Sequence, residues 1–141
     1  MKKVIFVLLM SVFYFSVNAQ EKIETKLPFS SSLKAGELLF VSGQVGINPA
    51  TSKLSNASFE AEVQQVMENL KNELKKDNLT MDDLVSTIIY LKDMKQYDRL
   101  NSVYGSYFKN RFPTRTCIAV ADLPAGASVE ISGVAHFKAK Q

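Results

Sequence analysis

The sequence predicts an α+β protein in which a mixed sheet carries two helices on one face. Three observations lead to this fold class: apolar strand-like segments near both ends of the chain, two amphipathic helical segments between them, and a β-branched segment that separates the helices. Helices with one apolar stripe pack on the apolar face of a sheet. We therefore expect the order strands, helix, strand, helix, and then two more strands.

Local signals define each expected element. Apolar segments at residues 37–43 and 45–47 follow a turn at 34–36 and precede a turn at 48–51, as expected of strands. The first helix begins after Ser58, a suitable N-cap, and ends near Asn78. Its apolar face is formed by Phe59, Val63, Val66, Met67, Leu70 and Leu74.

The second half of the chain continues the pattern. Residues 85–91 are β-branched and aromatic, which favours a central strand. Asp93 and Gln96 have the spacing of a capping box, which predicts a second helix that ends before Pro113. We assign its apolar face to the core; this face is formed by Tyr97, Leu100, Tyr104, Tyr107 and Phe108.

The last two strands each contain one charged residue among apolar ones. Arg115 precedes the segment 116–121, and Glu130 interrupts the segment 129–135. We interpret these segments as neighbouring strands, with Arg115 and Cys117 on one face of the first. Burying an unpaired charge is costly, so such a pair is a structural salt bridge, a solvated edge or a functional site.

The sheet face away from the helices is also apolar in this interpretation, and no third helix is available to cover it. We expect it to be buried against other subunits.

The N-terminus has the pattern of a cleavable signal peptide. Lys2 and Lys3 precede an apolar run at residues 4–17, which is shorter than the roughly 20 residues that span a bilayer. Small residues at 17–19 suit a signal peptidase. We expect a signal peptide at residues 1–19, a single domain at 20–141, and an exported protein that is periplasmic or secreted.

Charge and composition exclude several functions. Without Lys2 and Lys3, 15 basic residues oppose 14 acidic ones, so neither a nucleic-acid partner nor stable membrane association is expected. Cys117 is the only cysteine and His136 the only histidine. A disulfide, a protein-bound transition metal and a Ser-His or Cys-His nucleophile are therefore not expected.

Several separated motifs resemble those of the YjgF/RidA family, the reactive intermediate deaminases. They occur in the family's order across most of residues 26–137, at 41–44, 47–51, 100–108, 112–117, 123–124 and 129–131. The resemblance implies a chorismate-mutase-like fold and a homotrimer with ligand clefts between subunits. It also implies hydrolysis of 2-imino and 2-enamino acids, such as 2-iminobutyrate and 2-aminoacrylate, to 2-keto acids and ammonia without a cofactor.

The resemblance also assigns site residues. Arg115 would hold the substrate carboxylate through paired N–H donors, and Glu130 would position the attacking water and move a proton. Cys117 would contribute its backbone N–H and C=O. The residues expected to line the cleft are Ser42, Gly43, Asn101 and Phe29.

This chain departs from the family pattern at three positions. Phe29 replaces a tyrosine whose hydroxyl faces the ligand, a loss of about 1 kcal/mol that would lower efficiency or shift substrate choice. Ser52 replaces a loop glycine, and Ser132 replaces a second acidic residue that often follows the catalytic glutamate.

Two alternatives remain open. The aromatic ring of Phe29 and the exported location also suit a non-catalytic trimer that binds small carboxylates. A ribonuclease activity, described for some relatives, agrees less well with the nearly neutral domain.

Overall fold

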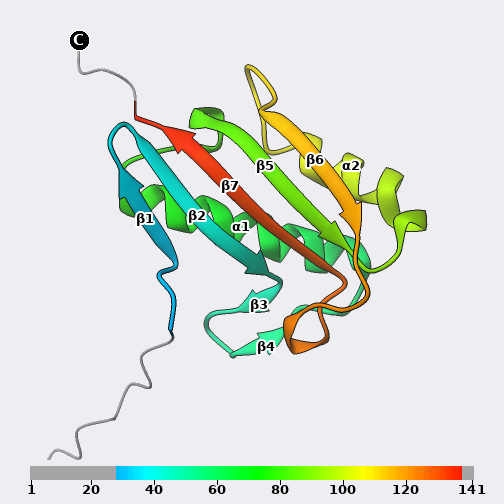
Figure 1. Cartoon of the computed structure of the whole chain (residues 1–141). Coiled ribbons are helices and arrows are strands. Elements are labelled where there is room, and N and C mark those ends of the chain that lie inside the picture. The colour runs from blue at the N-terminus through cyan, green and yellow to red at the C-terminus, as the bar shows by residue number, and fades with distance from the viewer. Residues whose placement is uncertain (1–27, 138–141) are drawn as a thin grey trace, which may run out of the picture.

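The computed structural model describes residues 28–137 as a five-stranded sheet with two helices on one face (Figure 1). The expected α+β class is confirmed, and the expected signal peptide lies outside the described residues. The strands are β1 (Ser32–Ala35), β2 (Leu38–Val45), β3 (Ile47–Asn48), β4 (Lys53–Leu54), β5 (Leu84–Leu91), β6 (Thr114–Ala119) and β7 (Val129–His136). The helices are α1 (Phe59–Lys76) and α2 (Tyr97–Gly105), with single 3-10 turns at Met81–Asp83, Met94–Gln96 and Pro124–Gly126.

The strand order in the sheet is β1-β2-β7-β5-β6, and only the β5–β6 pair is parallel. β5 therefore lies between β6 and β7, and the expectation that the strands of Arg115 and Glu130 are neighbours is wrong. The connection through α2 allows β6 to pair in parallel with one edge of β5. The last strand then pairs with the other edge of β5.

The ends of α1 follow the sequence signals. The Oγ atom of Ser58 accepts a hydrogen bond from the backbone N–H of Ala61 at 3.1 Å. Asn78, with φ 59°, takes the left-handed conformation that ends helices after the C-cap Asp77. The expected helix is confirmed at both ends.

The second helix is shorter than the sequence suggests. Asp93 caps a 3-10 turn by accepting a hydrogen bond from the N–H of Lys95 at 2.9 Å, and α2 itself begins at Tyr97. Tyr107 and Phe108 lie beyond its end, although the Phe108 ring packs 4.8 Å from that of Tyr104. Assigning Tyr97 to the core is wrong, because its side chain is exposed.

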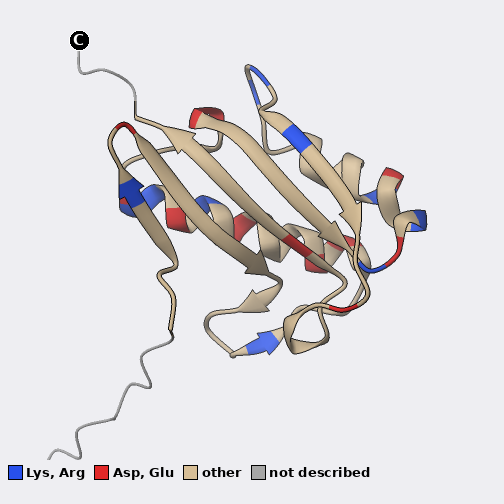
Figure 2. Cartoon of the chain, in the orientation of Figure 1, with Lys and Arg blue, Asp and Glu red and all other residues tan. Residues whose placement is uncertain are grey.

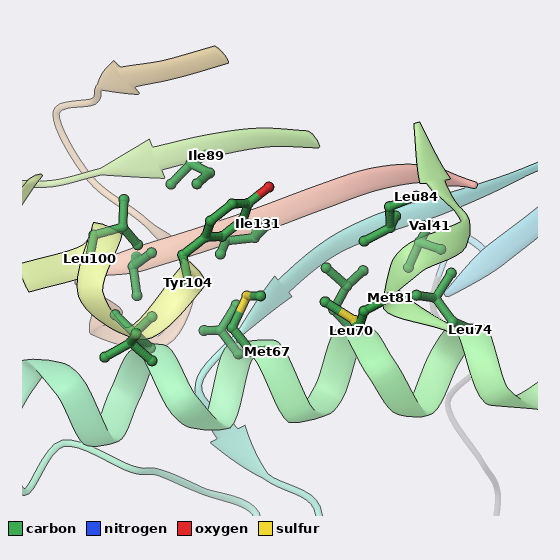
Figure 3. Close-up of a cluster of buried hydrophobic side chains, with 14 of the residues drawn as sticks. Val41, Met67, Leu70, Leu74, Met81, Leu84, Ile89, Leu100, Tyr104 and Ile131 are labelled. Atoms are coloured by element: carbon green, nitrogen blue, oxygen red, sulfur yellow. The ribbon is translucent and has the colours of Figure 1, made fainter. Parts of the chain in front are cut away.

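The hydrophobic core lies between the sheet and α1, whose apolar side chains point toward the strands (Figure 3). β5 and β7 contribute alternate residues to it, as half-buried strands do. The buried residues labelled in Figure 3 are Val41, Met67, Leu70, Leu74, Met81, Leu84, Ile89, Leu100, Tyr104 and Ile131.

Two short strands, β1 and β4, escape the sequence analysis, whereas β3 overlaps the strand expected at residues 45–47. β1 pairs with β2 at the edge of the sheet, and β3 pairs with β4 in a separate two-stranded ribbon. β1 and β4 contain few residues, most of them exposed, so they lack the apolar alternation that reveals a strand.

The face of the sheet opposite the helices is apolar and open, as expected. Large apolar side chains on this face are more than a third exposed: Leu33, Phe40, Ile88 and Ile118. Register places them on one surface, because Leu33 pairs with Phe40, and Ile88 neighbours the strand of Ile118. Exposed apolar side chains gathered on one face of a sheet are typical of an interaction site.

One ion pair joins the two helices and makes acid stability testable. The guanidinium of Arg99 donates to both carboxylate oxygens of Glu60, and this lowers the Glu60 pKa to about 2 from its usual 4.5. Because the folded-state pKa is the lower one, this stabilisation is complete above about pH 4.5 and is lost as the pH falls toward 2. We expect Glu60→Gln to lower the melting temperature at pH 7.

Thermal unfolding measured from pH 7 to pH 2 checks this. The difference between the wild type and Glu60→Gln should shrink as the pH falls. A difference that stays constant over this range would show that the ion pair contributes nothing.

Candidate functional site

Arg115 is held in place by two side chains of α2. It projects from β6 toward the helices, where one terminal nitrogen donates to Oδ1 of Asn101 at 2.8 Å. The other donates to the hydroxyl of Tyr97 at 2.7 Å. The guanidinium carbon also lies 5.3 Å from the Tyr97 ring centroid and 5.1 Å from that of Tyr104. Two hydrogen bonds and two aromatic faces fix the cation with few rotamers left to it.

Tyr104 is itself held in place by a hydrogen bond to β5. Its hydroxyl lies 2.9 Å from Oγ1 of Thr87, a buried residue of β5. Burial raises the Tyr104 pKa, so the phenol stays neutral beside Arg115. No salt bridge joins Arg115 to a carboxylate among residues 28–137, so its charge remains available to an anion.

A small cavity of about 330 Å³ opens beside Arg115. A guanidinium has five N–H donors, and the contacts to α2 leave donors for a ligand carboxylate. The cavity is lined by Asn101, Tyr104, Gly105, Phe112, Pro113 and Arg115. Its volume and single cation suit a small carboxylate with a short apolar side chain.

Cys117 lies two residues farther along β6, on the same face as Arg115, and packs against the hydrophobic core. Burial raises the pKa of its thiol. A thiol that stays protonated is a poor nucleophile. The side chain therefore serves packing, which agrees with a contribution through the backbone.

Glu130 belongs to a second group of predicted site residues. Its carboxylate occupies the space beside Gly43, where a Cβ atom would lie only 1.8 Å from Oε1 of Glu130. Ser42 precedes this glycine and donates its hydroxyl to the carbonyl oxygen of Ser30 at 2.7 Å. That bond ties β2 to the segment of Phe29, whose side chain is 62% exposed.

The predicted residues, together with Tyr97 and Tyr104 that the structure adds, thus form two half-sites. The Arg115 half-site contains Arg115, Cys117, Asn101, Tyr97 and Tyr104. The Glu130 half-site contains Glu130, Ser42, Gly43 and Phe29.

The two half-sites do not meet within one chain. Arg115 is the second residue of β6 and Glu130 the second residue of β7, and these strands run antiparallel with β5 between them. Figure 2 shows the single basic band of β6 and the single acidic band of β7 at different ends of the sheet. Strand geometry separates their Cα atoms by about 10 Å across the sheet and about 10 Å along it.

The two side chains also leave the sheet on opposite faces. Arg115 pairs in register with the buried Thr87, on the helix side. Glu130 pairs with Tyr90 and alternates with the buried Val129 and Ile131, which places it on the open side. No salt bridge joins Arg115 to Glu130, so the interpretation of this pair as a structural salt bridge is wrong within a single chain.

Sequence reasoning missed Tyr97 and Tyr104 as site residues. It placed both on an apolar helix face, because their spacing matches Leu100. The signal that could have found Tyr97 is its position four residues before Asn101, which puts the two polar groups on neighbouring turns.

Two features bear on cofactor and membrane. Residues 28–137 contain no group of three or more metal-ligating side chains. Within the same range, no helix is long and apolar enough to cross a membrane.

Gly43 gives a direct test of the Glu130 half-site. We expect Gly43→Ala to leave the fold intact, because the clashing atom belongs to the flexible end of a side chain. The Glu130 carboxylate must move, so any activity that depends on it should fall at least about tenfold.

Gly36→Ala, in the turn between β1 and β2 away from both half-sites, is the control: no atom lies within 4 Å of a Cβ there, and its positive φ also makes it a control for lost stability. Activity of Gly43→Ala equal to that of the control would contradict a functional position for Glu130. Thermal unfolding of both variants separates this effect from loss of structure.

Comparison with known proteins agrees with the fold and the motifs. The profile of the Ribonuc_L-PSP family, described as Endoribonuclease L-PSP, matches residues 19–137. A RutC family protein of Saccharolobus solfataricus is 37% identical over 109 residues, which cover 77% of this chain and 86% of that protein.

Two solved structures show the same architecture. RidA from an Antarctic Psychrobacter species is 31% identical, with a TM-score of 0.75 over 78% of this chain and 89% of that chain. TdcF of E. coli with bound serine is 26% identical, with a TM-score of 0.75 over 79% of this chain and 89% of that chain. The chain therefore belongs to the Ribonuc_L-PSP family, which unites the YjgF, RidA and RutC proteins.

Proposed function

We propose that this protein hydrolyses reactive 2-imino and 2-enamino acids to 2-keto acids and ammonia. The observation that carries the proposal is Arg115, fixed by Asn101 and Tyr97 at the wall of a small cavity and without a carboxylate partner in the described chain. Such a preorganised cation binds a substrate carboxylate and sets the position of the adjacent C=N bond.

The chemistry needs one positioned water and one proton carrier. Water adds to the imine carbon, which gives a carbinolamine, and the C–N bond then breaks to leave the keto acid and ammonia. Glu130 is suited to take a proton from the attacking water and to return it to the departing nitrogen. The protonated thiol of Cys117 takes no part, so its strand supplies only backbone donors and acceptors.

Because the half-sites are apart in one chain, we propose that the working site lies between two protomers. One protomer supplies Arg115 and the cavity, and its neighbour supplies Glu130 and Gly43. The open apolar face of the sheet, with Phe40 and Ile118 exposed, is suited to hold the protomers together. A homotrimer, the assembly implied by the family resemblance, would contain three such clefts.

Phe29 lacks the hydroxyl of the family tyrosine, and in the proposed site the tyrosine hydroxyl bonded to Arg115 comes from Tyr97. Tyr97 places a hydroxyl on the Arg115 guanidinium, whereas Phe29 offers only a ring.

The bound serine of TdcF is a small amino acid with a carboxylate, and this supports a ligand of that class here.

We also propose that the protein is exported, on the basis of the basic and apolar N-terminal segment. The family match begins at residue 19 and leaves that segment outside it. Fractionation of cells that produce the full chain, followed by N-terminal sequencing, tests this. A protein that retains its first residues in the cytosol would contradict export.

The function is tested with imines generated in place. A threonine/serine dehydratase produces 2-iminobutyrate or 2-aminoacrylate, semicarbazide traps the imine that escapes, and release of 2-keto acid is followed with and without the purified protein. Acceleration that disappears in Arg115→Ala supports the deaminase. Tight binding of 2-ketobutyrate without acceleration supports the alternative of a carboxylate-binding protein. Cleavage of RNA at physiological salt without imine turnover would instead support the activity in the family description.

A further inference from the structure

We propose a second binding site, for an amphipathic organic anion, in the pocket between α1, the 3-10 turn at Met81–Asp83 and the end of α2. This pocket has a volume of about 730 Å³, larger than the cavity at Arg115. It is lined by Gln64, Lys71, Lys75, Leu79, Thr80, Met81, Asp82, Ser106, Tyr107 and Lys109. None of these residues belongs to either half-site.

The floor of the pocket is apolar. Leu79 and Met81 are buried, and both belong to the hydrophobic core cluster that contains Leu74 (Figure 3). The ring of Tyr107 forms one wall, and its hydroxyl donates to the carbonyl oxygen of Gln64 at 3.3 Å. Burial, together with the Glu68 carboxylate, raises the Tyr107 pKa to about 12. This wall therefore stays uncharged and receives an apolar body.

The rim of the pocket is cationic. Lys71 and Lys75 lie one turn apart on α1, and Lys109 faces them from the segment after α2. Lys71 lies 3.3 Å from Glu68, but neither Lys75 nor Lys109 forms a salt bridge within residues 28–137. Three ammonium groups around one depression attract an anion.

The single carboxylate of the lining is already engaged. Asp82 accepts hydrogen bonds from the backbone N–H of Lys109 at 3.2 Å and from the side-chain amide of Asn110. Asp82 holds the loop of Lys109 in place, so its main effect is to orient Lys109 rather than to neutralise the ammonium charge of that residue. An apolar floor beneath a cationic rim fits a molecule with an apolar body and one carboxylate or phosphate group.

Binding can be measured with defined probes on the purified protein. 1-Naphthylacetate and 1-naphthyl phosphate carry the two anionic groups, and 2-(1-naphthyl)ethanol is the neutral control. Methyl NMR of Leu79 and Met81 reports on the floor of the pocket, with Met81→Leu to assign the methionine signal. We expect saturable shifts with one or both anions, and binding of the alcohol at least about tenfold weaker.

Substitutions separate this pocket from other apolar surfaces. We expect the double variant Lys75→Gln and Lys109→Gln to weaken anion binding roughly tenfold, with imine turnover unchanged. The double variant Lys34→Gln and Lys53→Gln removes the same charge elsewhere and should bind as the wild type. Arg115→Ala should also bind normally, which excludes the cavity at Arg115.

Three results would overturn the proposal: no saturable shift of the Leu79 and Met81 methyl signals, equal affinity for the neutral alcohol, or unchanged affinity in the Lys75 and Lys109 variant. None of them depends on whether the protein is a deaminase. If one anion binds and the other does not, the preferred one defines the ligand's charged group.

Discussion

Arg115→Ala should lower kcat/KM for 2-iminobutyrate by about a hundredfold or more, because the substrate loses a bidentate, charge-assisted anchor. In the structure the guanidinium is already oriented by Asn101 and Tyr97, so the wild type spends little entropy on placing it. Alanine removes both the charge and the orientation of the C=N bond. We therefore expect a higher KM as well as a lower kcat.

Arg111→Ala is the matched control, because it removes an exposed arginine from the loop before β6. It should retain nearly wild-type turnover. Arg115→Lys should recover only part of the activity, since an ammonium cannot form the paired contact. Turnover by Arg115→Ala equal to that of Arg111→Ala would contradict the role assigned to Arg115.

Glu130→Gln should lower kcat by about a hundredfold to ten-thousandfold, the usual contribution of a general acid–base group. Glutamine has nearly the same shape beside Gly43, so the cleft should keep its form and KM should change little. This separation of kcat from KM distinguishes Glu130 from Arg115. Steady-state kinetics in the dehydratase-coupled assay measures both constants.

Glu37→Gln provides the control for Glu130→Gln. Its carboxylate is exposed and lies 3.4 Å from His136, away from both half-sites. A large fall in kcat with Glu37→Gln, or none with Glu130→Gln, would remove Glu130 from the mechanism.

Much of the fold could be predicted because its signals are local. The N-cap Ser58, the apolar stripe of α1 and the β-branched β5 each report on their own neighbourhood. The shared face of Arg115 and Cys117 in β6 was also predicted, because side chains alternate along a strand whatever its partners are. The open apolar face followed from the same alternation.

Strand order could not be predicted, because it depends on contacts between distant segments. Nothing in the residues of β6 indicates that it pairs with β5 and leaves β7 on the other side. The assignment of Arg115 and Glu130 to neighbouring strands failed for this reason. Tyr97 was missed for a related one: its hydroxyl gains a role only when β6 brings Arg115 beside α2.

The half-sites explain why a chain with a well-formed arginine cavity still needs a neighbour. Arg115 faces the helix side, whereas Glu130 faces the open side at the other end of the sheet. An imino acid of about six or seven heavy atoms cannot bridge the two within one chain, given the separation along and across the strands. Assembly is therefore part of the proposed catalytic mechanism.

The central claim is that Arg115 and Glu130 act together from different protomers, and mixed oligomers test it most directly. Arg115→Ala and Glu130→Gln chains with different tags would be co-expressed, and mixed assemblies purified through both tags and assayed for imine turnover. In a random mixture of trimers, about three quarters are mixed, and each mixed trimer holds one intact site of three. The purified mixed trimers should therefore show about a third of wild-type activity, and the unfractionated mixture about a quarter. Mixed trimers that are no more active than either parent variant would contradict the account.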